Sequence, residues 1–299
     1  MIDWPALAFR PPSVRNRLPR ASRACPLALR DLVGALVGEA SAVPIVRAPT
    51  PAVARAALVA AKEAGSALGL AAPPEAPERW FDAVTAIADE IAPGLPLLLG
   101  ATVRVGPGEV EAGRALRLAQ RLVDAGLTHL ALDLDAVAPA RRAEDLARIA
   151  EPALERGLGV ECLLPAAEGA LPSADAAFAL LSELGSLGAA PDLAGVRLPP
   201  APAGEDPALA AALKRLADAA GGVPLSARGA AAARVARRLR PGTLRAADDG
   251  GAAAAAAGEG APERGEARAY AEAGLLVDAL GAGGSAAIVA AALARAREE

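Results

Sequence analysis

Residues 129–164 read HLALDLDAVAPARRAEDLARIAEPALERGLGVECLL, and they contain one complete copy of the pattern that decides the fold. Residues 129–133 are a short apolar run, which predicts a strand. Residues 140–156 carry apolar side chains at the 3.6-residue spacing of a helix with one buried face. Gly157 ends this helix, and residues 158–164 form a second apolar run. A strand, a helix and a strand in this order are typical of a parallel sheet.

The same alternation continues on both sides of this unit. Further strands are predicted at residues 43–47, 66–71, 95–103, 194–198, 222–226 and 242–246. Further helices are predicted at residues 77–91, 109–125, 173–187, 206–219, 229–239 and 284–297, after a first helical stretch that runs through Lys62. Eight strand–helix units predict a closed (β/α)8 TIM barrel, and an open doubly wound sheet is the alternative. The glycine- and alanine-rich residues 249–266 are predicted to form a flexible loop after the eighth strand.

The N-terminal segment has a different composition from the rest of the chain. Residues 4–30 contain six arginines and several prolines but no acidic residue. Residues 1–30 are therefore predicted to be an arm that wraps the barrel or extends into solvent, and residues 31–299 a single barrel domain. Because clusters of like charge often mark interaction tails, docking to an acidic partner is the alternative for this arm.

Composition excludes several classes of protein. The net charge of −4 argues against a nucleic-acid-binding protein, which would be basic, and 2% aromatic residues are too few for a base-stacking surface. Two cysteines cannot form a disulfide framework and fit a reducing compartment. No strongly apolar run of about 18 residues and no signal peptide are apparent, so we expect a cytoplasmic protein without a membrane segment.

Several stretches of the sequence resemble the class II tagatose-bisphosphate aldolase family, and in particular its accessory, non-catalytic subunit. They read PTPAVARAALVAAKEAGS at residues 49–66, APERWFDAVTAIADE at 76–90, LVDAGLTHLALD at 122–133 and GVECLLPAAE at 159–168. In the last stretch, a glutamate, a proline and a second glutamate keep the spacing of the family's strand-five motif. The resemblance implies an aldolase-like barrel in carbohydrate metabolism, with a catalytic aldolase subunit or a second copy of the chain as partner.

The sequence departs from this family at the metal site. The family places an Asp-His pair after its third strand and another histidine at its seventh, but residues 99–107 (LGATVRVGP) and 223–228 (VPLSAR) contain neither. The single histidine, His129, is placed at the N-terminal end of a strand, away from the catalytic end of a barrel. We therefore predict no metal, and the ligands that zinc needs are missing. Mg²⁺ or Mn²⁺ held by carboxylates is the alternative. Lys62 and Lys214 fall within helices, which argues against a Schiff base.

Two groups of candidate site residues remain. Asp133, Glu161 and Glu168 match the resemblance and are predicted to be catalytic remnants, with Asp133 and Glu161 placed at strand ends. Ser226, Arg228 and Gly229 follow the seventh strand, where barrels often bind phosphate at a helix N-terminus. Capping of the helix by Ser226 is the alternative.

Three functions follow from these residues. The first is a catalytically inactive accessory or scaffold subunit, which predicts an exposed apolar patch. The second is an active lyase or aldolase that uses a carboxylate-bound metal on a sugar phosphate, which predicts convergence of Asp133, Glu161 and a third acid. The third is non-catalytic binding of a phosphorylated metabolite, which predicts a pocket with Arg104 or Arg228 facing inward and no carboxylate cluster.

Overall fold

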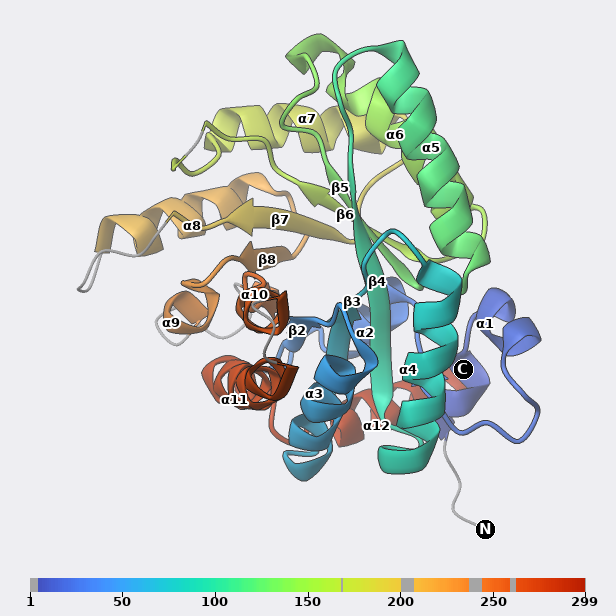
Figure 1. The fold of residues 1–299 in the computed structure, drawn as a ribbon. Coiled ribbons are helices and arrows are strands. Elements are labelled where there is room, and N and C mark those ends of the chain that lie inside the picture. The colour runs from blue at the N-terminus through green and yellow to red at the C-terminus, as the bar shows by residue number, and fades with distance from the viewer. Residues whose placement is uncertain (1–4, 168, 200–206, 237–243, 259–261, 299) are drawn as a thin grey trace.

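The computed structural model describes residues 5–167, 169–199, 207–236, 244–258 and 262–298. Within these residues, eight parallel strands close into a barrel, because β2 pairs with β9 and β4 pairs with β5 (Figure 1). The barrel strands are β2 (Val43–Arg47), β3 (Leu68–Ala71), β4 (Pro96–Arg104), β5 (His129–Asp133), β6 (Gly159–Leu163), β7 (Leu193–Arg197), β8 (Leu225–Arg228) and β9 (Leu244–Asp248). The predicted (β/α)8 barrel is confirmed, and the open sheet is not.

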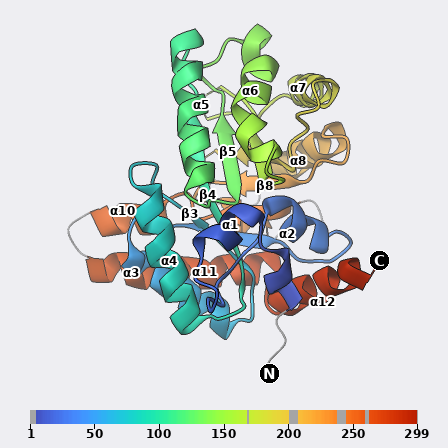
Figure 2. The ribbon, with the colours of Figure 1, turned by 90° about the vertical axis from the view of Figure 1, so that its right-hand side faces the viewer.

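Helices surround the barrel on its outer side (Figures 1 and 2). They are α3 (Pro51–Glu63), α4 (Pro77–Ile91), α5 (Glu109–Asp124), α6 (Arg142–Leu154), α7 (Ala174–Ser186), α8 (Pro207–Ala219), α9 (Ala232–Ala236) and α11 (Pro262–Leu280), with a 3-10 turn, η2 (Pro139–Arg141), before α6. Their apolar faces bury leucine, valine and alanine side chains against the outward face of the strands in one large core. This layer places the carboxyl ends of the strands, and the loops that follow them, at one mouth.

Two predictions near the C-terminal end were wrong in detail. The predicted loop at 249–266 contains a helix, α10 (Ala252–Gly258), and the beginning of α11, while residues 259–261 lie outside the described part. Alanine is the strongest helix former, so the alanine run folds as a helix. Strand β8 begins at Leu225, three residues later than predicted, whereas residues 242 and 243 of the predicted eighth strand lie outside the described part and β9 is described from Leu244. Before β8, Gly221 and Gly222 have positive φ angles and form a turn instead.

The N-terminal segment packs against the opposite, N-terminal end of the barrel. It forms η1 (Pro5–Phe9), α1 (Pro12–Arg17), a short strand β1 (Cys25–Pro26) beside the beginning of β4, and α2 (Leu29–Ala35). Its leucines, together with α12 (Ser285–Glu298), bury a second apolar cluster inside this end. Figure 2 shows α2 and α12 at this end of the barrel. Leu29 contacts β6 so closely that a Cβ atom added at Gly159 would overlap it.

Several arginines of this segment bind groups of the same chain. Arg10 donates to the carbonyl of Ser22 at 2.7 Å, and Arg17 and Arg30 form ion pairs at 3.0 Å with Asp82 and Asp192, respectively. The buried leucines of this segment explain why it packs against the barrel, because their burial removes apolar surface from water.

Within the described residues, no single helix is long and apolar enough to cross a membrane. Helices α11 and α12 meet the length and composition criteria only when they are taken together, and they are bent by 62° relative to each other.

Candidate functional site

A network of charged side chains fills the interior of the barrel. His129 Nε2 lies 3.0 Å from Glu161 Oε2, which places the side chain of His129 inside the barrel. Glu161 Oε1 accepts hydrogen bonds from Ser226 Oγ and, at 2.9 Å, from Arg228 Nε, while Arg228 Nη2 pairs with Glu161 Oε2. The Glu161 side chain has no exposed surface. Glu161 therefore lies in the middle of β6 and at the centre of the network, and its predicted position at a strand end was wrong.

Two glycines on neighbouring strands make room for this network. A Cβ atom at Gly100 of β4 would lie 2.5 Å from His129 Nδ1, and one at Gly195 of β7 would lie 2.5 Å from Glu161 Oε1. Side chains at these two positions would occupy the space of the imidazole and the carboxylate. The glycines of β4 and β7 thus leave space for the imidazole on the adjacent strand β5 and for the carboxylate on the adjacent strand β6.

The two charges at the centre hold each other in the ionised form. Burial alone would raise the pKa of Glu161, but the charge of Arg228 and hydrogen bonds from His129 and Arg228 hold it well below its usual range. Burial opposes the charge of Arg228 as well, yet Glu161 raises the pKa of this guanidinium above its ordinary value. The barrel thus contains a permanent cation and a permanent anion.

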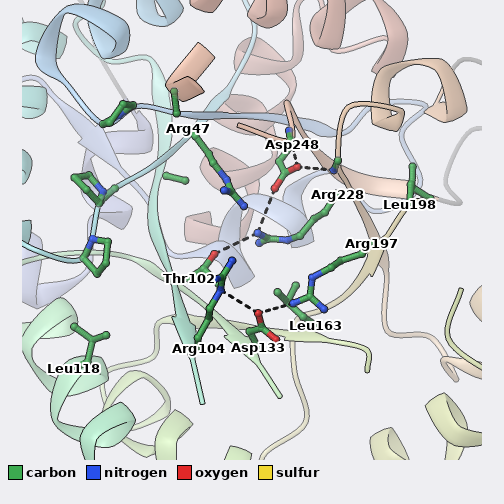
Figure 3. A pocket seen from close by; sticks show the side chains of 18 residues that line it. Arg47, Thr102, Arg104, Leu118, Asp133, Leu163, Arg197, Leu198, Arg228 and Asp248 are labelled. Atoms are coloured by element: carbon green, nitrogen blue, oxygen red, sulfur yellow. Dashed lines mark hydrogen bonds and ion pairs between the residues drawn. The ribbon is translucent and has the colours of Figure 1, made fainter. Parts of the chain in front are cut away.

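Above this network, at the mouth, a second set of ion pairs surrounds Asp133. Its Oδ2 lies 2.7 Å from Arg197 Nη2 and 3.5 Å from Arg104 Nε (Figure 3). Arg197 also pairs with Asp135 at 2.5 Å. Arg228 reaches toward the mouth from below, where its Nη1 lies 3.3 Å from Asp248 Oδ2.

These side chains line a pocket of about 600 Å³ at the carboxyl ends of the strands. Four of its described lining residues are arginines and two are aspartates, so the lining is positively charged; they are Arg47, Arg104, Arg197, Arg228, Asp133 and Asp248. In the described part of the chain, the Arg47 guanidinium has no hydrogen bond or ion pair, and the Arg104 side chain is 84% exposed. Both have donors available for an anion.

The predicted phosphate segment uses its donors within the protein. Ser226 and Arg228 donate to Glu161, and the backbone N–H of Gly229 donates to Asp248 Oδ1 at 2.9 Å. Arg228 and Gly229 nevertheless line the pocket. Arg47 was not among the predicted site residues, although it is the last residue of the first barrel strand, a position at the mouth of such a fold.

The residues present do not fit a divalent metal. Among the described residues, no three histidine, cysteine or acidic side chains come together as a metal site. Glu161 and Asp133 each pair with arginine, and a metal ion near Glu161 would be repelled by the guanidinium of Arg228. Glu168 lies outside the described residues, and the thiols of Cys25 and Cys162 are both buried.

Asp249, beside the pocket, carries a poorly satisfied carboxylate. Its Oδ1 accepts from the backbone N–H of Arg47 at 3.3 Å and of Gly251 at 2.8 Å, while Oδ2 is buried without a hydrogen bond in the described structure. Burial raises the pKa of Asp249 to about 6. Because the unfolded chain releases this proton at lower pH, the folded state loses stability as pH rises from about 4 to 6.

Replacing Asp249 by asparagine is therefore expected to raise the free energy of unfolding at pH 7 by about 2 kcal/mol. The amide oxygen still accepts from the two N–H groups, but no charge is buried. Urea unfolding of both proteins at pH 4 and pH 7 measures this. The gain should shrink at the lower pH, and an equal difference at both pH values would contradict the assignment.

Comparisons with known proteins bear on the fold. No family model matches this chain, and no curated protein matches it. Among solved structures, it is similar to the YdjI aldolase from Escherichia coli K12, with a TM-score of 0.66 and 14% identity over 86% of this chain and 98% of that one. It is also similar to the fructose-bisphosphate aldolase from Campylobacter jejuni, with a TM-score of 0.63 and 12% identity over 86% and 95% of the two chains. The chain has an aldolase-like (β/α)8 barrel fold.

Proposed function

We propose that this chain is a degenerate aldolase-like barrel that binds a small phosphorylated metabolite at its mouth and does not carry out metal-dependent aldol cleavage. The arginine-lined pocket is the observation that carries this proposal. Guanidinium groups bind phosphate through two parallel hydrogen bonds and stay charged at every physiological pH. The pocket brings such groups from four different strands to one cavity, with donors of Arg47 and Arg104 still available.

The absence of aldol chemistry is proposed from the residues that replace the metal site of the resembling family. Metal-dependent aldol cleavage needs a bound cation that polarises the carbonyl group of the substrate. Here the interior contains a guanidinium held by a buried carboxylate, and only one histidine, which binds the same carboxylate. These side chains favour binding of an anion over binding of a second cation.

An accessory or scaffold role beside a catalytic aldolase subunit, or with a second copy of the chain, is part of the same proposal. It rests on the resemblance to the accessory subunit of the tagatose-bisphosphate aldolases, and a cytoplasmic location fits two free, buried cysteines. The large apolar side chains exposed in the described structure are spread over several elements; they are Val37, Val110, Phe178, Leu187, Tyr270 and Leu275. These scattered positions do not form one docking patch for a partner protein, whereas the pocket gathers four arginines in one cavity. Ligand binding is therefore the better supported part of the proposal.

Binding of inorganic phosphate tests the proposed site. Isothermal titration calorimetry should detect saturable binding at low salt, and the double variant Arg47→Ala/Arg104→Ala should bind about tenfold more weakly or worse, because each lost charge-assisted hydrogen bond costs about 1.5–3 kcal/mol. Arg20→Ala removes an exposed arginine outside the pocket and should bind like the wild type. Equal affinity of the double variant and the wild type would place the phosphate elsewhere.

The purified wild-type protein should not cleave tagatose- or fructose-bisphosphate when zinc, manganese or magnesium is added in turn. Cleavage that depends on one of these ions would contradict the proposed loss of activity. It would favour the alternative of a lyase whose carboxylates, such as Asp133, have replaced the histidines.

A further inference from the structure

The pocket has few groups that can bind the hydroxyls of a sugar. Of its 18 described lining residues, nine are alanine, leucine or proline, and Thr102 alone has an uncharged polar side chain. Thr102 Oγ1 already accepts a long hydrogen bond, 3.4 Å, from Arg228 Nη1. The carboxylates of Asp133 and Asp248 are in ion pairs with arginines. Neutral donors and acceptors are thus scarce in the described lining.

Four of the apolar lining residues come from the loops after β2 and β3 and from α5. Pro49 follows β2, Pro73 and Pro74 follow β3, and Leu118 projects from α5; we call these four residues the proline wall. Figure 3 shows Leu118 on the far side of the pocket from Arg197, with Arg104 between them. Proline has no backbone N–H, so this wall offers almost no donors. The pocket therefore combines four arginines with an apolar wall, and two further apolar residues, Leu163 and Leu198, lie on the side of Arg197 (Figure 3).

A polyhydroxylated ligand does not suit this lining. Each hydroxyl buried against the proline wall would lose its hydrogen bonds to water and find no side-chain partner there, which weakens binding. A hydrocarbon group in the same place gains affinity because its surface leaves water. We infer that the ligand is a phosphate ester of a largely hydrocarbon alcohol, with its phosphate among the arginines and its hydrocarbon on the proline wall. This inference rests on the proposed function and specifies the class of ligand.

A matched pair of esters tests the inference. Propyl phosphate and glycerol 3-phosphate have the same three-carbon skeleton and the same charged group, and they differ by two hydroxyls. Titration calorimetry on the full chain, with inorganic phosphate as reference, should show propyl phosphate binding about tenfold more tightly than glycerol 3-phosphate. Glycerol 3-phosphate binding as tightly as propyl phosphate, or more tightly, would overturn the inference and leave the proposed function intact. Failure of all three compounds to bind would overturn both.

A substitution in the proline wall locates the hydrocarbon group. Leu118→Asn places an amide on the wall, where it can hydrogen-bond a hydroxyl, and should reduce the preference for propyl phosphate to about threefold or less. Leu116→Asn makes the same change at a half-buried position of the same helix that does not line the pocket, and should leave the tenfold preference unchanged. An unchanged preference in Leu118→Asn would overturn the placement on this wall.

Discussion

Replacing Arg228 by methionine is expected to lower the free energy of unfolding by about 3–5 kcal/mol. Methionine fills much of the same volume but leaves the Glu161 carboxylate without its main ionic partner. This carboxylate has no exposed surface, so water cannot replace the guanidinium. Its remaining hydrogen-bond partners would be Ser226 and His129. Removing one member of a buried pair is costly because the other charge stays buried and uncompensated.

Urea unfolding of the single and double variants separates this effect from lost packing. Glu161→Gln combined with Arg228→Met removes both charges and keeps an acceptor for Ser226. The double variant should therefore be more stable than Arg228→Met alone, even though it carries one more substitution. A double variant whose loss equals the sum of the two single losses would contradict a buried ionic pair. The pH dependence of unfolding provides a second measure, since Arg228→Met should let Glu161 take up a proton at higher pH.

Replacing Gly159 by alanine is expected to cost about 2–3 kcal/mol. A Cβ atom at this position would overlap Leu29 Cβ and would lie 2.9 Å from Leu29 Cα, which is backbone of α2 and cannot rotate away. Either β6 or α2 must move, and α2 contributes Leu29, Leu32 and Val33 to the apolar cluster at the N-terminal end of the barrel. Because Gly159 has no side chain, α2 of the N-terminal segment can pack directly against β6.

Gly274→Ala is the matched control for this substitution. Gly274 lies within α11 and has no atom within 4 Å of an added Cβ, so alanine should raise stability by up to about 1 kcal/mol. Hydrogen exchange on Gly159→Ala should show faster exchange in α2 than in the wild type. Protection of α2 that stays at the wild-type level, together with unchanged stability, would show that the structure accommodates the methyl group.

Much of the fold could be predicted because it follows from local patterns. The ranges 43–47, 77–91 and 129–133 agree with β2, α4 and β5 to the residue, since each combines a clear apolar period with a proline, glycine or polar boundary. The glycine content of residues 249–266 indicated a loop, so the helix α10 within this segment was not predicted. Its alanine run favours a helix, and α10 also packs closely on α11, because Gly265 of α11 lies so near Ala257 of α10 that an added Cβ would be 2.6 Å away.

The site was harder to predict than the fold. Asp133, Glu161 and Arg228 were identified as candidates singly, but their partners depend on the register between strands, which no single sequence pattern reveals. His129 was predicted to lie away from the catalytic end because it begins a strand. Alternate residues of a strand share a face, so the position of His129 on the same side as Asp133 was a signal in the sequence that pointed into the barrel. The roles proposed for Asp133, Glu161, Ser226, Arg228 and Gly229 remain predictions.

The buried guanidinium of Arg228 has a consequence for how such a pocket behaves in a cell. A metal site in a barrel is filled only when enough free metal ion is present, so its occupancy depends on the metal concentration and falls when a chelator competes for the ion. Arg228 is part of the polypeptide and is present in every copy from the moment the chain folds. The positive charge at the base of this pocket is therefore inherited with the gene and does not vary with the nutrition of the cell.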